Sequence, residues 1–292
     1  MANSPHLFCF GLGFSARVFA EDRLSIGWTV SGTCQGADKQ RDLQAAGITA
    51  HLFDQRRPLP EAAFAGVTHV LVSVPPDADG DPVLDAHADD LAAMPGLEWL
   101  GYLSTTGVYG DTGGKMVDET APTRPDVERS RRRALAEAAW LDLQRAHDVP
   151  VQVFRLAGIY GPGRSLLDTV RAGRAKRVDK PGHVFSRIHV EDIARVLAAS
   201  IARPRPGAVY NLCDDAPAPP AEVTEFACGL LGVEVPPLIP FAEAEKAMSA
   251  MARSFWADNR RVDNGLIKRE LGVALKYPDY QSGLRAILAA GG

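Results

Sequence analysis

Short apolar runs alternate with amphipathic stretches along the first half of the chain. Apolar runs bounded by glycine, proline or polar residues are typical of strands buried on both faces, and the stretches between them have helical spacing. Strands are predicted at residues 7–10, 28–30, 48–53, 68–74, 99–104 and 151–156. Helices are predicted at residues 16–23, 38–46, 60–65, 83–94 and 129–147. This alternation predicts an α/β fold with a doubly wound parallel sheet.

The alternation becomes less regular after Gly161-Pro162-Gly163, and prolines crowd residues 217–240. Further predictions are a basic helix at 171–177, a strand-like segment at 187–190, a helix from Asp192, a strand at 208–212 and a helix at 223–231. We therefore predict a first domain over residues 1–160 and a smaller C-terminal substrate-binding region over residues 161–292, with some segments that return to the sheet.

Composition and charge favour an ordinary globular protein with a small-molecule partner. Of 292 residues, 46% are hydrophobic and 23% are charged. The net charge of −4 gives no general attraction to nucleic acid or to a membrane surface. The four cysteines lie far apart in no metal-ligand pattern, which predicts no metal site and fits a reducing cytoplasm. Because no stretch has the features of a signal peptide or a membrane span, we expect a cytoplasmic location.

A Gly-x-Gly-x-x-Ala turn joins the first predicted strand to the first predicted helix. In such a turn the first glycine bends the chain, the second lets a pyrophosphate approach the backbone, and the third small residue packs helix on strand. The helix N-terminus attracts the phosphates. Residues 1–160 are therefore predicted to be a Rossmann-type NAD(P)-binding domain. The residues expected at the dinucleotide are Gly11, Gly13, Phe14, Ser15 and Ala16, with Val74 and Pro75 after the fourth strand.

The end of the second predicted strand favours NADP over NAD. A carboxylate normally lies there in NAD-binding proteins, because it accepts hydrogen bonds from the ribose hydroxyls and repels a 2′-phosphate. Residues 31–35 contain no carboxylate, whereas the hydroxyl of Thr33 and the side chains of Lys39 and Arg41 can meet a phosphate. A solvated helix face also explains the two cations, so NAD stays open.

Five sequence blocks carry a resemblance to a known family. They are residues 11–16, 103–110, 156–163, 187–192 and 210–212. In this order they resemble the extended short-chain dehydrogenase/reductase superfamily, in its NAD-dependent epimerase/dehydratase group, over most of the chain. The resemblance is specific for the superfamily and does not fix an activity.

The resemblance implies that Thr105 is the catalytic Ser/Thr at the reacting oxygen, and we expect Thr106 to contact the substrate. It also implies a Tyr-x-x-x-Lys pair on the next helix, in which lysine holds the nicotinamide ribose and lowers the tyrosine pKa. That pair is missing. Aligning Ala136-Glu137 with the family's Ala-Glu places Arg129 at the tyrosine and Arg133 at the lysine. Arginine can donate to the cofactor or to a phosphate but is a poor proton acceptor, so the chain resembles an atypical member.

Two tyrosines can replace the missing base. Tyr109 and Tyr160 lie in blocks that the family places beside the nicotinamide or the substrate, although a tyrosine at a strand end is more often a half-buried packing anchor than a base. Ser130 has no evident activating partner. Among cations near the substrate region, Arg187 is the better candidate for an anionic group, since the family uses Arg155 for packing.

The block at residues 187–192 also carries two structural expectations. His189 is expected to make a structural hydrogen bond, and Asp192 is expected to cap the next helix.

Three functions fit these residues. The first is an NADP-dependent oxidoreductase or epimerase that acts on a nucleotide-sugar-like or other hydroxylated metabolite. The second is a non-catalytic dinucleotide-binding sensor or scaffold, which the missing pair supports. The third is a reductase of unrelated carbonyl or flavonoid-like substrates. A homodimer through the helices at 83–94 and 129–147 stays open, since the arginine-rich start of the second helix would repel its mate unless acidic residues cover it.

Overall fold

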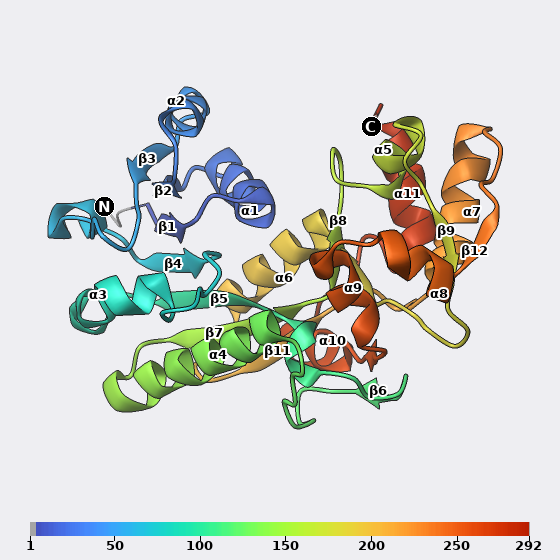
Figure 1. Cartoon of the computed structure of the whole chain (residues 1–292). Coiled ribbons are helices and arrows are strands. Elements are labelled where there is room, and N and C mark those ends of the chain that lie inside the picture. The colour runs from blue at the N-terminus through green and yellow to red at the C-terminus, as the bar shows by residue number, and fades with distance from the viewer. Residues whose placement is uncertain (1–3, 292) are drawn as a thin grey trace. The chain divides into compact units, whose positions relative to one another are not determined.

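Figure 1 shows a computed structural model of the chain, which describes residues 4–291. Its largest sheet has seven strands in the order β11-β7-β5-β4-β1-β2-β3. These are β1 (His6–Phe10), β2 (Thr29–Cys34), β3 (Thr49–Leu52), β4 (His69–Val72), β5 (Trp99–Thr105), β7 (Val151–Leu156) and β11 (Val209–Leu212). The strands are parallel, as the alternation of strands and helices predicts. The doubly wound α/β class is therefore confirmed.

The contacts of the chain divide it into two compact units whose segments alternate along the sequence. The first unit consists of residues up to Thr105, Glu128–Arg155 and Ile193–Tyr210; the second consists of Thr106–Val127, Leu156–Asp192 and Asn211 onward. The predicted first domain over residues 1–160 is interrupted in this arrangement, since residues 106–127 and 156–160 belong to the second unit. The reason is that the chain leaves the sheet after β5 and after β7 and later returns to it.

Helices cover both faces of the sheet in the first unit. They are α1 (Phe14–Ser25), α2 (Ala37–Ala45), η1 (Glu61–Phe64), α3 (Pro82–Ala93), α4 (Glu128–His147) and α6 (Val190–Ala202). On one face α3 and α4 lie side by side (Figure 1), and Trp140 of α4 packs into a cluster with Tyr102 of β5. On the other face Trp99 contacts Phe19 of α1 and donates its indole N–H to Ser200 of α6. Alternate residues of β5 therefore face opposite helical layers.

The second unit is built from short elements. Its strands are β6 (Met116–Val117), β8 (Gly158–Tyr160), β9 (Arg177–Asp179), β10 (Arg187–His189), β12 (Leu238–Pro240) and β13 (Arg261–Val262). Its helices are η2 (Thr106–Tyr109), α5 (Leu166–Arg171), α7 (Pro220–Leu231), α8 (Phe241–Ala244), η3 (Glu245–Ala247), α9 (Ala250–Ala257), α10 (Gly265–Leu271) and α11 (Tyr280–Ala289). The strands form three parallel pairs, β10 with β8, β12 with β9 and β13 with β6. A hydrophobic cluster joins α5, α7 and α11.

Two local predictions were wrong. The basic helix predicted at residues 171–177 does not form: α5 ends at Arg171, Gly173 has a left-handed φ of 64°, and β9 begins at Arg177. Asp192 is not the N-cap of α6, because that helix begins at Val190. Its carboxylate accepts the backbone N–H groups of Lys276 (2.7 Å) and Tyr277 (2.9 Å), so it anchors a loop of the second unit.

Among residues 4–291, no helix combines the length and the apolar character needed to cross a membrane.

Candidate functional site

The glycine turn lies between β1 and α1, beside the end of β4. Gly11 has φ +82°, and a Cβ there would lie 3.0 Å from Val74 Cγ2 and 3.1 Å from Ser73 Oγ. Ser73 donates its hydroxyl hydrogen to the Gly11 carbonyl. Gly11 N–H in turn donates to Thr33 Oγ1 at 2.8 Å. Glycine is therefore required at position 11 by both conformation and space.

Gly13 differs from Gly11 in both respects. It is the N-cap of α1 with φ −76°, makes no side-chain cap, and has nothing within 4 Å of the place where a Cβ would lie. Ala16, in the first turn of α1, is buried against the sheet. The first N–H groups of α1 thus have no side-chain cap, and the space beside Gly13 is free of other atoms. Such a helix N-terminus can bind phosphate groups.

The structure brings together only some of the residues expected at the dinucleotide. Val74 contacts the turn and Thr33 lies buried beneath it, whereas Pro75 is exposed after β4. Lys39 is exposed on α2, and Arg41 is exposed and paired with Asp38. Asp38 is the first carboxylate after β2 in the sequence, so the end of that strand carries no acid of its own.

A buried polar network at the end of β5 was not predicted from the sequence. Ser104 donates its hydroxyl hydrogen to Glu137 of α4, and the same carboxylate is paired with Arg155 of β7 at 2.8 Å. Both charged side chains are buried. Arg155 therefore lies inside the first unit, in agreement with the packing role that the family resemblance implies. The adjacent Thr105 ends β5 and is half-buried.

Arg133 lies one helical turn before Glu137 on α4. Its Nη1 donates to the Leu103 carbonyl oxygen at 2.7 Å and to the Tyr102 hydroxyl at 3.3 Å. Burial raises the pKa of Tyr102 well above its ordinary range. Arg129 is exposed at the start of the helix, and α4 carries neither tyrosine nor lysine. A guanidinium thus reaches the carboxyl end of β5 from the helix on which the family has its Tyr-x-x-x-Lys pair.

Tyr109 is buried in the second unit. Its hydroxyl donates to Asn211 Oδ1 at 2.7 Å, and Asn211 N–H donates to Glu119 at 2.8 Å. Burial raises the pKa of the Glu119 carboxyl. Thr106, which begins η2, is also buried. These contacts hold η2 to the neighbouring segments of the same unit.

Tyr160 packs against α11, and a Cβ at Gly283 would lie 2.1 Å from its hydroxyl oxygen. Burial, with the nearby Asp214 and Asp192 carboxylates, raises the pKa of Tyr160 far above its ordinary range. A tyrosine in such surroundings resists ionisation and is a poor general base at neutral pH.

His189 and Arg187 are held by the interior of the second unit. His189 Nδ1 accepts from Glu191 N–H at 3.2 Å, and burial lowers the pKa of its imidazole to about 4. Arg187 Nη1 donates to the carbonyls of Phe185 (2.9 Å) and Ala218 (3.2 Å). Beside Arg187, burial raises the pKa of Asp214 to about 7. Nη1 of Arg187 is thus directed at two backbone carbonyls.

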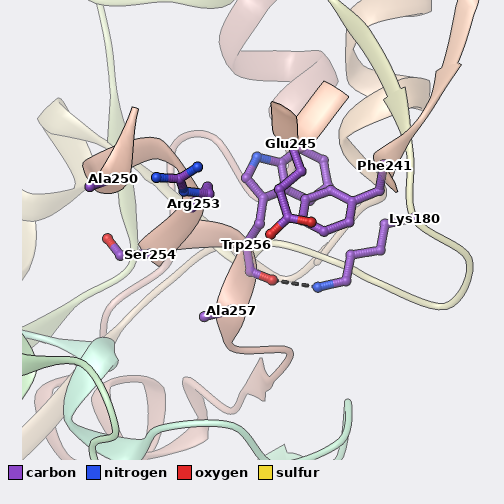
Figure 2. Close-up of a pocket in the computed structure, with 8 residues that line it drawn as sticks. All are labelled: Lys180, Phe241, Glu245, Ala250, Arg253, Ser254, Trp256 and Ala257. Atoms are coloured by element: carbon purple, nitrogen blue, oxygen red, sulfur yellow. Dashed lines mark hydrogen bonds between the residues drawn. The ribbon is translucent and has the colours of Figure 1, made fainter. Parts of the chain in front are cut away.

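A cavity of about 390 Å³ lies in the second unit (Figure 2). It is lined by Lys180, Phe241, Glu245, Ala250, Arg253, Ser254, Trp256 and Ala257. None of these residues was singled out from the sequence, because they come from separate short elements whose proximity no local spacing indicates. Among residues 4–291 there is no group of three His, Cys, Asp or Glu side chains that could hold a metal ion.

Comparisons with known proteins relate the chain to one family. The model of the NAD dependent epimerase/dehydratase family matches residues 90–213. Protein YeeZ of Escherichia coli strain K12 is 28% identical over 287 residues, which is 92% of this chain and 95% of that protein. A functionally unknown conserved protein from Silicibacter pomeroyi DSS is 48% identical in structure-based comparison, with a TM-score of 0.91 over 98% of this chain and 99% of that one.

More distant solved structures share the fold. A dTDP-glucose 4,6-dehydratase from Bacillus anthracis, in complex with NAD, is 19% identical with a TM-score of 0.80 over 98% of this chain and 96% of that one. A UDP-glucuronic acid 4-epimerase from Bacillus cereus, in complex with NAD, is 14% identical with a TM-score of 0.77 over 98% and 100%. The family match over residues 90–213, the glycine turn and the parallel sheet agree with the resemblance to the extended short-chain dehydrogenase/reductase superfamily, in its NAD-dependent epimerase/dehydratase group.

Proposed function

We propose that the chain binds NAD(P) at the turn formed by residues 11–16 and is an oxidoreductase or epimerase of hydroxylated metabolites. The observation that carries this proposal is that Gly11 is closely surrounded whereas Gly13 has free space beside it. Gly11 is fixed against Ser73 and Val74, while the backbone at Gly13 is open above the uncapped start of α1. That space suits a pyrophosphate, whose oxygens can accept hydrogen bonds from backbone N–H groups.

The residues around the turn favour NADP, with NAD as the alternative. The absence of a carboxylate within residues 31–35 removes the group that repels a 2′-phosphate. Lys39 is exposed on α2, the helix that follows this segment. Thr33 accepts the Gly11 N–H, so in this proposal it supports the turn rather than the phosphate. The solved relatives that bind NAD are too distant to decide the choice.

A bound nicotinamide would supply reversible hydride transfer at a substrate carbon. In this proposal the Thr105 hydroxyl donates a hydrogen bond to the reacting oxygen, and Thr106 belongs to the same block. Arg133 replaces lysine as the cation of α4 and, through its contact with Leu103, steadies the strand end that carries Thr105. A nucleotide-sugar-like substrate is proposed by analogy with the named activities of the distant relatives alone.

An enzymatic function also needs a side chain that accepts the proton of the substrate hydroxyl. Burial disfavours ionisation of Tyr160, and Tyr109 is buried as well, with its hydroxyl donated to Asn211, so neither tyrosine is poised to accept a proton. A second candidate function is a dinucleotide-binding sensor or scaffold without turnover. It is favoured by α4, which carries arginine but no tyrosine or lysine, because arginine is a poor proton acceptor.

Calorimetric titration with NADPH and NADH tests binding. Gly13→Val should fold normally, because nothing lies near a Cβ at that position, and should lose dinucleotide binding by at least about 100-fold. Gly229→Ala is the matched control, since Gly229 also has open space around it but belongs to α7. Retention of binding by Gly13→Val would rule out the turn as the site.

A measurement of substrate turnover distinguishes the enzyme function from the non-catalytic sensor or scaffold. With NADPH or NADP and a panel of sugar nucleotides and carbonyl compounds, the enzyme function predicts a change in nicotinamide absorbance that Thr105→Val and Tyr109→Phe diminish. Tight dinucleotide binding with no change for any compound would favour the sensor. Turnover unaffected by Tyr109→Phe would exclude that tyrosine as the base.

A further inference from the structure

The cavity of the second unit has aromatic residues along one wall. The Trp256 ring stacks on His183, with centroids 5.3 Å apart and planes 23° apart, and lies 5.3 Å from Phe241. The Lys180 ammonium lies 4.6 Å above the Phe241 ring and donates to the Trp256 carbonyl oxygen. Lys180 thus contacts two of the aromatic residues that line the cavity.

His183 contributes packing but no charge to this wall. The side chain is buried, and burial together with the nearby Lys180 lowers the pKa of its imidazole to about 4. At neutral pH the ring is therefore uncharged. The charged residues that line the cavity are Lys180, Arg253 and Glu245. Two are positive and one is negative, so the lining carries one excess positive charge.

Two of the lining charges have no partner within residues 4–291. Arg253 and Glu245 are both exposed to solvent, and neither the guanidinium nor the carboxylate makes a hydrogen bond or an ion pair with any described group, although they have opposite charges and line the same cavity. In the view of Figure 2 the Glu245 carboxylate lies between Arg253 and Lys180. An unpaired guanidinium can take a carboxylate or phosphate through two parallel hydrogen bonds, and an unpaired carboxylate can accept from hydroxyl groups.

The cavity is open to solvent, so its size indicates which group it can hold and does not limit the whole ligand. Sites for small molecules usually span about 300–1,000 Å³, and this cavity of about 390 Å³ is near the lower end. It suits one sugar-sized group better than a complete nucleotide diphosphate sugar. Phe241 and Trp256 add apolar surface to the lining, and an aromatic side chain can pack against the C–H groups of a sugar.

We propose that this cavity binds a small hydroxylated anion, a sugar acid or a sugar phosphate, with Arg253 on the anionic group and Glu245 on the hydroxyls. The inference deepens the proposed function, since it names a substrate class for it. The excess positive charge selects anions over neutral sugars, and the unpaired Glu245 selects hydroxylated anions over plain ones.

Tryptophan fluorescence gives a direct readout of binding. Trp256 is the one tryptophan of the second unit, because Trp28, Trp99 and Trp140 all belong to the first. The full chain is titrated with D-glucuronate, D-glucose 6-phosphate, D-glucose, inorganic phosphate and UDP-glucuronate. We expect a saturable change with glucuronate or glucose 6-phosphate, and the tighter of the two decides between carboxylate and phosphate.

Matched variants assign the signal to the cavity. Arg253→Gln should weaken binding of the preferred anion at least about tenfold, and Glu245→Gln should weaken it while inorganic phosphate binds at least as tightly, because the positive charge of the cavity rises. Arg174→Gln, an exposed arginine of the same unit outside the cavity, should change binding by less than about twofold.

Three results would overturn the proposal: no saturable change with any probe, equal binding of glucose and glucuronate, or binding of UDP-glucuronate without binding of glucuronate. The Gly13→Val variant separates this site from the dinucleotide site. If the wild type and Gly13→Val both bind the sugar anion but the wild type binds no dinucleotide, the proposed function is wrong and the cavity proposal is retained.

Discussion

Glu137 of α4 and Arg155 of β7 form an ion pair inside the first unit, with 2.8 Å between Arg155 Nη2 and Glu137 Oε2. Arg155 Nε also donates to the same carboxylate at 3.1 Å. Ser104 of β5 adds its hydroxyl to the carboxylate. One buried carboxylate thus joins α4 to two strands at the edge of the sheet where Thr105 lies.

Removal of one partner from this pair should be strongly destabilising. Glu137→Gln or Arg155→Met leaves a buried charge unpaired, so we expect a loss of about 3–5 kcal/mol in the free energy of unfolding. Urea unfolding measures it. Arg145→Ala on the exposed pair with Asp142 of the same helix is the control and should change stability by less than about 1 kcal/mol. Similar losses in the two cases would show that the buried pair is not specially coupled.

Substitution by alanine should destabilise the protein at Gly11 but have little effect on its stability at Gly13. Gly11→Ala forces a Cβ against Val74 at a left-handed φ, so it should lower the free energy of unfolding by about 1–3 kcal/mol. Gly13→Ala meets no atom and has a negative φ, and its effect on stability should stay within about 1 kcal/mol. Thermal unfolding of both variants without ligand is the measurement. Equal destabilisation would contradict the geometry of the turn.

Asp214 should make the protein less stable as the pH rises. Burial raises its folded-state pKa from 3.8 to about 7, against an attraction to Arg187 and with repulsion from Asp215. The folded state therefore holds a proton that the unfolded state releases, so stability is greatest below about pH 4 and falls until about pH 7. Asp214→Asn should raise the free energy of unfolding at pH 8 by about 2–4 kcal/mol and have little effect at pH 4. Glu234→Gln, at an exposed acid of the same unit that does not act on Asp214, is the control.

His183 should have the opposite pH dependence. Its folded-state pKa is lowered from 6.5 to about 4, by burial first and then by Lys180 and Arg260, while Asp111 opposes the shift. The unfolded state binds the proton more tightly, so this group's contribution is complete above about pH 6.5 and is lost as the pH falls to about 4. His183→Phe keeps the stacking on Trp256 and should flatten the acid limb of a plot of Tm against pH. An unchanged acid limb would mean that His183 does not limit acid stability.

The sequence predicts the sheet well and the site only in part. Runs such as Leu7–Phe10 coincide with a strand because burial on both faces leaves an uninterrupted apolar pattern, and the glycine turn is visible because its spacing is local. Asp192 shows the limit of local rules. An acid near a helix start predicts a cap, but this one accepts from backbone groups 84 and 85 residues away.

The buried network was missed for the same reason. Ser104 and Glu137 are 33 residues apart, and Glu137 and Arg155 are 18 apart, so no spacing indicates that they meet. In the sequence Glu137 belongs to a helix with many charged residues, so nothing indicates that its carboxylate is buried. The basic segment 171–177 failed in another way, because its residues are good helix formers but Gly173 adopts a left-handed conformation that ends the helix.

The order in which the strands of the large sheet arise along the chain also matters during synthesis. When translation has reached residue 160, six of the seven strands exist, but β11, the neighbour of β7, has not been made. The open backbone edge of β7 is then available for pairing with any other extended segment. The nascent protein therefore carries an aggregation-prone edge on the ribosome until residue 212 emerges, and a chaperone bound in that interval would shield β7.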